Sequence, residues 1–413
     1  MSMKICLINN LYPPHARGGA EQVVYKTVQG LLEAGHEVVV ITTVPEGPHV
    51  WREGRLTIYR VVPKNLFFYT AAHQHSFLTR ALWHLIDMFH AGVARTVAEI
   101  LRQEKPEVVH THNLMGVSFL VPRIIRELGI RHLHTVHDVQ LVEPSGIILK
   151  AKENSWRYRG LPTRAYTAIM RRLMGSPDVV ISPSQFLLDF YEKRGFFPGA
   201  KRVVLRNPVT MSLKHATASG RGPDQGGKNT KTLKQNFINE SHGVNFLYLG
   251  QIEEHKGVVF LVNVFRSFGN DQAVLHIVGA GSQFERVKEM ASVVNTIIVH
   301  GKVDRDKLPE LFAETDVLIV PSLCYENSPT VIFEAFSFGV PVLASRVEGV
   351  AELIREGENG LTFETGNEAS LKEKLTWCVE HREDLQAMSK KTAQSLHGLS
   401  ERDYIERLQY LYV

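Results

Sequence analysis

Short apolar runs alternate with segments of helical periodicity along the whole chain, and this alternation constrains the fold more than any other feature. Residues 38–41 are Val-Val-Val-Ile, a continuous β-branched run typical of a parallel strand buried on both faces. Residues 21–34 instead repeat apolar side chains at helical spacing, and Gly35 follows them. The expected strands cover residues 4–9, 37–42, 108–112, 131–136, 179–182, 202–205, 245–249, 274–278, 296–300, 317–320 and 341–344. Such alternation predicts an α/β protein with one doubly wound parallel sheet in each half.

Length and composition divide the chain into two domains. A chain of 413 residues is too long for one typical core. A stretch rich in Gly, Ser, Thr, Asn and Lys separates the halves and is expected to be a flexible linker or insertion. Apolar residues at helical spacing in residues 401–413 predict a terminal helix. We therefore predict an N-terminal domain over 1–209, a linker over 210–243, a C-terminal domain over 244–395 and a terminal helix over 396–413.

The charge and cysteine content narrow the setting. A net charge of +4 permits contact with phosphates or anionic lipid without demanding it, and no nucleic-acid partner is expected. The three cysteines are far apart and form no metal-binding spacing, which favours a reduced, cytoplasmic protein. Neither a membrane-spanning run nor a signal peptide is predicted.

Two carboxylates, Glu326 and Glu334, flank a turn and the start of an expected helix. The turn contains Asn327, Ser328 and Pro329. Backbone N–H groups at such a helix start can bind an anionic ligand, and a carboxylate further along could hold sugar or ribose hydroxyls. The alternative is a capped surface helix with two solvated glutamates.

Glycine-bearing turns follow three of the expected strands. Gly18 and Gly19 precede the first helix, where backbone can approach a phosphate, but the spacing differs from that of dinucleotide binders. Lys256 stands between a strand and a helix, a reasonable place for a phosphate ligand. Gly279 follows the next strand and fits either a close ligand or simple turn chemistry.

Histidines collect where strands of the first half end. His137 precedes Asp138 and could orient a sugar hydroxyl or relay a proton. His110 and His112 share one face of a strand and would also suit a metal, although no further ligand motif completes such a site. For His110 and His134 the plainer interpretation is a hydrogen-bonded core histidine.

The string Asp304-Arg305-Asp306 matches the DxD motif of some metal-dependent sugar transferases. Because it opens an expected helix at residues 307–314, we interpret it as a helix N-cap instead. No metal site is predicted.

Taken in order, these motifs resemble the retaining glycosyltransferases of family 4, which have the GT-B fold. The resemblance spans nearly the whole chain. It rests on residues 18–21, 134–138, 182–186, 207–209, 250–257, 279–281, 326–334, 339–342 and 359–361. It implies two Rossmann-like domains facing a central cleft, with the terminal helix crossing back onto the N-terminal domain.

The resemblance also implies roles for single residues. Glu334 would hold the ribose of a nucleotide sugar, whereas Glu326 with the backbone of Asn327 and Ser328 would face the donor sugar. Lys256, Gln251 and Gly279 would line the donor site, helped by Gly18 and Gly19. His137 would contact the transferred sugar at the reacting centre. No cofactor is implied beyond a UDP- or GDP-sugar co-substrate.

One position departs from the family pattern. The residue after the first glycine of the Gly…Lys-Gly motif is usually arginine, and here it is Gln251. An amide cannot supply the bidentate charge of a guanidinium. A non-catalytic nucleotide-sugar-binding protein is therefore an alternative. A sugar-nucleotide epimerase on the same fold is another, which the Glu326–Glu334 spacing disfavours.

The acceptor side has two interpretations. Residues 66–90 are rich in aromatic and apolar side chains, and residues 150–172 are rich in Lys and Arg. Together they could bind a glycan or lipid-linked anionic acceptor at the inner membrane face. Ordinary helix packing with a solvated basic face explains the same composition.

Overall fold

The computed structural model describes residues 2–15, 18–210 and 243–413. The chain forms two compact units. Unit 1 comprises Met1–Ile147, Ser155–Pro208 and Leu399–Val413, and unit 2 comprises Ile148–Asn154 and Val209–Gly398. Segment 148–154 thus belongs to unit 2, although the sequence placed it in the N-terminal domain. Most of the predicted linker, residues 211–242, lies outside the described residues.

Unit 1 is built on an eight-stranded sheet in the order β3-β4-β2-β1-β5-β6-β7-β8. Its strands are β1 (Lys4–Ile8), β2 (Glu37–Thr43), β3 (His49–Glu53), β4 (Leu56–Val61), β5 (Val108–Thr111), β6 (Arg131–Thr135), β7 (Val179–Ser182) and β8 (Lys201–Val204). Only the edge strand β3, among the strands described for this sheet, runs antiparallel to its neighbour. The predicted doubly wound parallel sheet is confirmed.

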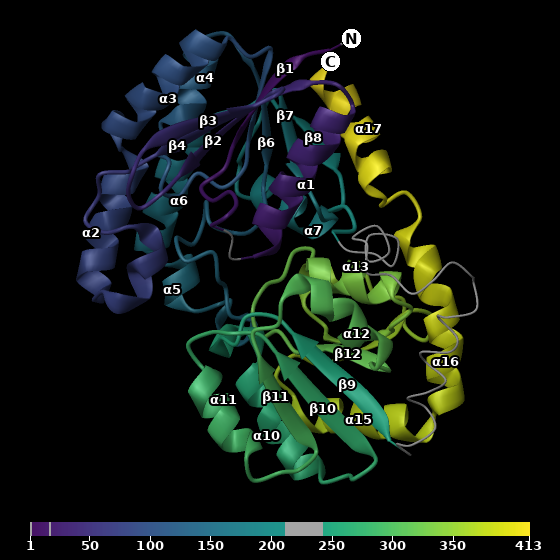
Figure 1. Ribbon diagram of the computed structural model, residues 1–413. Coiled ribbons are helices and arrows are strands. Elements are labelled where there is room, and N and C mark those ends of the chain that lie inside the picture. Colours follow the sequence, from purple (N-terminus) through teal and green to yellow (C-terminus); the bar gives the residue numbers. More distant parts are fainter. Residues whose placement is uncertain (1, 16–17, 211–242) are drawn as a thin grey trace. The chain divides into compact units, whose positions relative to one another are not determined.

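Helices cover both faces of this sheet (Figure 1). They are α1 (Gly19–Glu33), α2 (Phe77–Met88), α3 (Ala91–Glu104), α4 (Val121–Glu127), α5 (Trp156–Arg159), α6 (Leu161–Met174), α7 (Gln185–Glu192) and α17 (Glu401–Tyr412), with a 3-10 turn η1 (Tyr69–Gln74). The terminal helix α17 packs beside α1, and its Tyr404, Ile405 and Leu408 enter the core of unit 1. The chain therefore returns to unit 1 at its end, as the resemblance implied.

Unit 2 has a six-stranded sheet in the order β11-β10-β9-β12-β13-β14, parallel throughout its described strands. The strands are β9 (Val244–Leu249), β10 (Ala273–Val278), β11 (Ile297–Gly301), β12 (Val317–Val320), β13 (Val342–Ser345) and β14 (Gly360–Phe363). The helical elements are η2 (Lys150–Lys152), η3 (Glu254–Lys256), α10 (Val258–Phe268), α11 (Phe284–Ala291), η4 (Arg305–Lys307), α12 (Leu308–Ala313), α13 (Thr330–Ser337), α14 (Glu348–Ala351), α15 (Glu368–Glu380), α16 (Arg382–Lys391) and η5 (Thr392–Leu396). One continuous apolar core joins this sheet to α10, α11, α15 and α16.

A tight contact fixes α17 against α1. A Cβ atom on Gly30 of α1 would lie 2.4 Å from Cγ1 of Ile405, so glycine is required for this close approach. The core position of α17 thus depends on a missing side chain in α1.

We expect Gly30→Ala to destabilise the protein, although alanine is the better helix former. The clash should lower the free energy of unfolding by about 1–3 kcal/mol. The higher helix propensity of alanine, roughly 1 kcal/mol, should offset only part of this loss. Urea unfolding of Gly30→Ala, Ile405→Ala and the double variant measures this. The double variant should be more stable than the sum of the single effects predicts, by at least about 1 kcal/mol. Additive effects would contradict the contact.

Candidate functional site

The strand order of each sheet marks where a ligand can bind. In unit 2 the chain winds outward in opposite directions from β9 and β12, which are neighbours. In open parallel sheets, ligands bind at the carboxyl ends of the strands beside such a reversal. The loops there are residues 250–257 after β9 and 321–329 after β12. These loops carry most of the predicted donor-binding residues.

An ion pair joins these two loops. Nζ of Lys256, at the end of η3, lies 2.6 Å from Oε1 of Glu326, and Ser322 Oγ donates to the same oxygen at 2.8 Å. Burial lowers the pKa of Lys256, but the negative charge of Glu326 more than offsets this, so the pKa lies above its ordinary value. A fixed ammonium group therefore stands at the carboxyl edge of the sheet, where it can bind an anionic oxygen.

Glycines allow the loops around Lys256 to press together. Gly257 has a φ of +77°, and a Cβ there would lie 1.9 Å from the carbonyl oxygen of Pro321. Gly279 has a φ of +149°, and its Cβ would lie 1.8 Å from the carbonyl oxygen of Gly250. The sequence left Gly279 open between ligand contact and turn chemistry. The structure gives it a packing reason of its own.

Gln251 lies in the loop that carries Lys256. Its carbonyl oxygen accepts a hydrogen bond from the hydroxyl of Tyr248 at 2.6 Å, which fixes the backbone of the loop. Gln251 is exposed to solvent. The backbone of Gln251, where the family pattern has arginine, is thus fixed at the same edge as Lys256.

The turn before α13 brings Asn327 and Ser328 to this edge as predicted. The carbonyl of Glu326 accepts the N–H of Gly349 at 3.0 Å. A Cβ on Gly349 would lie 1.9 Å from the carbonyl oxygen of Asn327. The start of α14 therefore packs closely against the turn and hydrogen-bonds to it.

Glu334 is a buried carboxylate within α13, with only 3% of its surface exposed. Its Oε1 accepts hydrogen bonds from Arg305 Nη2 and Thr210 Oγ1, both at 2.7 Å. A carboxylate removed from water needs such partners to stay charged. Glu334 is therefore not the solvated glutamate of the alternative interpretation.

Arg305 is a residue that the sequence analysis missed. Asp304 occupies the N-cap position of η4, as the sequence predicts, but its side chain makes no capping hydrogen bond there. The arginine between the two aspartates instead reaches the buried Glu334. No local signal reveals this pairing, because 29 positions separate the two residues in the chain.

In unit 1, His137 follows β6 and is paired with His112, which follows β5. Nδ1 of His112 lies 3.0 Å from Nε2 of His137. Burial lowers the pKa of His137 to about 4, and it holds the pKa of His112 well below its usual range, so both imidazoles are neutral at pH 7. Between two neutral rings, one nitrogen must donate and the other accept.

A cavity of about 20 Å³ lies beside this pair. Its lining includes His112, His134, His137, Asp138 and Tyr191. Within the described part of the chain, Nε2 of the buried His112 has no hydrogen-bond partner. This volume suits one water molecule, which could complete the hydrogen bonding of His112.

The glycine loop of unit 1 leads into Glu21, whose charge acts on Asp138, the neighbour of His137. The N–H of Gly18 donates to the carboxylate of Glu21 at 2.8 Å, so the chain itself uses one donor predicted for phosphate. Burial raises the pKa of Asp138 to about 6, and the charge of Glu21 adds to the shift. Gly18, Gly19 and His137 thus share the carboxyl edge of the sheet of unit 1.

The remaining histidines of these strands are core residues. His110 bonds to the hydroxyls of Tyr412 and Thr135, and His132 and His134 both bond to the hydroxyl of Thr111. The plainer interpretation of His110 and His134 is confirmed. Across the residues that the structure describes, no three His, Cys, Asp or Glu side chains are grouped to hold a metal ion.

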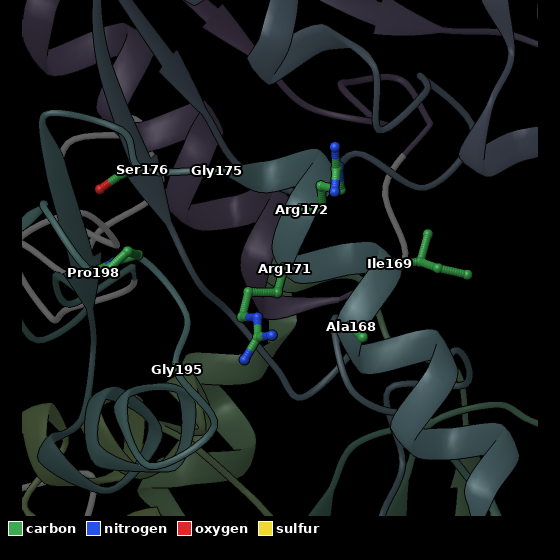
Figure 2. A pocket seen from close by; sticks show the side chains of 8 residues that line it. All are labelled: Ala168, Ile169, Arg171, Arg172, Gly175, Ser176, Gly195 and Pro198. Atoms are coloured by element: carbon green, nitrogen blue, oxygen red, sulfur yellow. The ribbon is translucent and has the colours of Figure 1, made fainter.

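A second cavity of unit 1 lies elsewhere. It is a groove of about 770 Å³ at the end of α6 (Figure 2). Its lining residues Ser176 and Pro198 precede β7 and β8, so it lies at the amino ends of the strands. Figure 2 shows Arg171 pointing toward the loop of Gly195 and Arg172 pointing away from it. The two cations do not converge, and we do not assign the predicted site to this groove.

Comparisons with known proteins agree with this geometry. The family model "Glycosyltransferase Family 4" matches residues 17–213, and "Glycosyl transferases group 1" matches residues 230–395. An uncharacterized glycosyltransferase of Methanocaldococcus jannaschii is 25% identical, with 92% of this chain and 88% of that protein covered. A lipopolysaccharide 1,2-N-acetylglucosaminetransferase of Salmonella typhimurium is 27% identical over 44% of this chain and 47% of its own length.

A solved structure shows the same fold. Anabaena HepE in complex with UDP and glucose superposes with a TM-score of 0.69, covering 99% of each chain at 16% identity. The two parallel-sheet units are thus those of the GT-B fold.

The buried histidines predict acid sensitivity. Burial lowers the pKa of His110 and His132 to about 3 and that of His137 to about 4, and it holds those of His112 and His134 well below the ordinary value. A lowered folded pKa means that the unfolded chain binds the proton first. Stability is therefore present above about pH 6.5 and lost as the pH falls through the folded pKa values, toward about 3. At pH 5 each such histidine should cost about 2 kcal/mol.

Two aspartates oppose this loss. Burial raises the pKa of Asp87 to about 7 and that of Asp138 to about 6, so their burial becomes less costly as they take up protons below pH 7. The stability lost at the five histidines should exceed the stability gained at the two aspartates. Urea unfolding at pH 7.5 and pH 5 measures the difference, which His110→Gln should reduce by about 2 kcal/mol. The exposed control His397→Gln should leave it unchanged. Equal stability at both pH values would contradict the prediction.

Proposed function

Because this chain belongs to the GT-B glycosyltransferases of group 1 and family 4, we propose that it is a retaining hexosyltransferase with a nucleotide-diphospho-sugar donor. The observation that carries the proposal is the set of charged residues at the carboxyl edge of unit 2. Lys256, in the loop after β9, pairs with Glu326, in the loop after β12. Glu334 is buried in α13, the helix that follows Glu326.

The chemistry of each residue suits a part of such a donor. Lys256 would bind the diphosphate, because its ammonium group is fixed and charged. Glu334 would accept the ribose hydroxyls with carboxylate lone pairs that Arg305 and Thr210 do not use. Glu326, Asn327 and Ser328 would face the hexose. We propose UDP or GDP as the nucleotide, and the bound UDP of HepE supports the first.

His137 would act beside the sugar as a neutral group. A neutral imidazole can donate to or accept from a hydroxyl without adding charge. The leaving diphosphate itself would take the acceptor proton, so the site needs no separate base. No metal ion is part of this proposal, and the chelator EDTA should not reduce turnover.

The acceptor would be a glycan or a lipid-linked glycan precursor in cell-surface polysaccharide or glycolipid synthesis. The lipopolysaccharide transferase among the relatives supports this class. None of the described helices is long and apolar enough to cross a membrane. We propose a cytoplasmic enzyme with a peripheral contact at the inner membrane face.

We expect Glu334→Gln to weaken the binding of the donor nucleotide by about 10- to 100-fold, because a charged acceptor for two hydroxyls is lost. Thermal-shift titration with UDP, GDP, ADP and their sugars measures this. The variant of the exposed Glu310, Glu310→Gln, is the control and should bind normally. Arg305→Gln should show a smaller loss, since it removes the support of Glu334. If no nucleotide sugar stabilises the native protein, the proposal fails.

A second candidate is a binding protein without turnover, and Gln251 favours it. We expect the native protein to turn over a donor sugar, and Gln251→Arg to lower the KM for the donor by about 5- to 10-fold through an added charge. The exposed Gln272→Arg adds the same charge elsewhere and should have no effect. Turnover that appears only in Gln251→Arg would favour the binding protein.

A further inference from the structure

Helix α2 of unit 1 is held in place by its inner face. Trp83 is buried, and its Nε1 donates to the carbonyl of Phe67 at 2.7 Å. Both carboxylate oxygens of the buried Asp87 accept the N–H of Gly116, at 2.9 and 3.1 Å. These buried hydrogen bonds define which side of the helix faces inward.

The outer face of α2 is also apolar. Phe77 is 75% exposed, Leu78 77%, Leu82 50%, Leu85 52% and Phe89 45%. The last four recur at the spacing of one helical stripe. A surface helix normally turns such a stripe toward the core, and large exposed apolar patches mark interaction sites.

A second exposed apolar group lies on α5 and the start of α6. Trp156 is 73% exposed and Leu161 is 76% exposed. Figure 1 shows α2 near α5 and α6 within unit 1, and the charge of Asp87 acts on Tyr166 of α6. The two apolar groups therefore belong to neighbouring elements.

The segments that carry these apolar side chains are also rich in cations. Residues 62–90 and 155–176 contain seven Lys or Arg against a single acid, the buried Asp87, for a formal charge of +6. The rest of the chain has 40 Lys or Arg against 42 Asp or Glu, a charge of −2. The positive excess of the protein is thus concentrated in these two segments. Arg80, Arg157, Arg159 and Arg164 are all exposed there.

We propose that this docking face, formed by Phe77, Leu78, Leu82, Leu85, Phe89, Trp156 and Leu161 with the four exposed arginines, binds an anionic phospholipid surface. Apolar side chains would enter the headgroup boundary while the arginines contact lipid phosphates. A second copy of the chain fits less well, because two such faces would bring like charges together. This docking face rests on the proposed function and names the residues that would make its membrane contact.

Vesicle flotation tests the docking face with the full-length protein. Native protein should float with vesicles that contain anionic phosphatidylglycerol and much less with pure phosphatidylcholine. Leu82→Glu should reduce binding at least tenfold, because it places a charge within the apolar stripe. The control is Val293→Glu in unit 2, since Val293 is 69% exposed and lies outside the face. It should float like the native protein.

The charge contribution has its own test. Arg80→Gln with Arg164→Gln should weaken binding to anionic vesicles by about tenfold or more at low salt, and the loss should shrink at high salt. The exposed pair Arg402→Gln with Arg407→Gln removes the same charge from α17 and should bind normally. Equal losses in both pairs would overturn the assignment, because net charge alone would then explain binding.

Two further outcomes decide between occupants. Trp156 fluorescence should shift to shorter wavelength on anionic vesicles, and this shift should vanish in Trp156→Phe. If Leu82→Glu instead converts a dimer to a monomer in light scattering while vesicle binding is absent, the face binds a second copy and the proposal is overturned. Nucleotide titration of Leu82→Glu separates the two proposals. Normal donor binding with lost flotation supports the docking face, whereas flotation without donor binding refutes only the proposed donor chemistry.

Discussion

The structure depends on the geometry of the parallel crossover. Consecutive parallel strands are joined by a crossover, usually a helix. The carboxyl ends of the parallel strands therefore all point the same way, and the loops that follow them lie on one edge of the sheet. Lys256 and Glu326 are 70 positions apart, yet they meet because β9 and β12 are neighbours in opposite winding directions. The same rule places Gly18, His112 and His137 on one edge of unit 1. The site residues need no local sequence motif to find one another.

Ion pairs hold the charged residues of unit 2 in place. A lysine next to Glu326 and an arginine next to Glu334 keep each buried or half-buried charge compensated. A phosphate that binds Lys256 must therefore share this cation with Glu326. An anionic diphosphate would compete with Glu326 for this ammonium group better than a neutral sugar could, in keeping with the proposed donor.

The sequence predicted the central strands because they are buried on both faces and read as continuous apolar runs, as in residues 38–41. It missed β3, whose five residues are all exposed, and β4 and β14 near the ends of their sheets. The exposed β3 lacks the apolar run that marks a buried strand. Strand β14 is buried but short, with four residues that begin at Gly360, so its apolar signal is brief. The candidates Lys256 and Glu326 were proposed from their positions in loops after strands, and Glu334 from its place in the helix that follows Glu326. Arg305 was not, because its role comes from a tertiary contact with α13.

Helix α2 shows why periodicity alone cannot orient a helix. Both its faces are apolar, so the hydrophobic pattern fits either orientation. Its polar groups decide between them. Rotating α2 about its axis by half a turn would expose Trp83 to solvent. It would also leave the N–H of Gly116 without the Asp87 carboxylate that now accepts it. A buried, unsatisfied N–H costs about 1–3 kcal/mol. The apolar area exposed to water is similar in the two orientations, so the hydrophobic free energy does not distinguish them. The buried hydrogen bonds of Trp83 and Asp87 therefore favour the orientation in which the leucine face of α2 lies outside the fold.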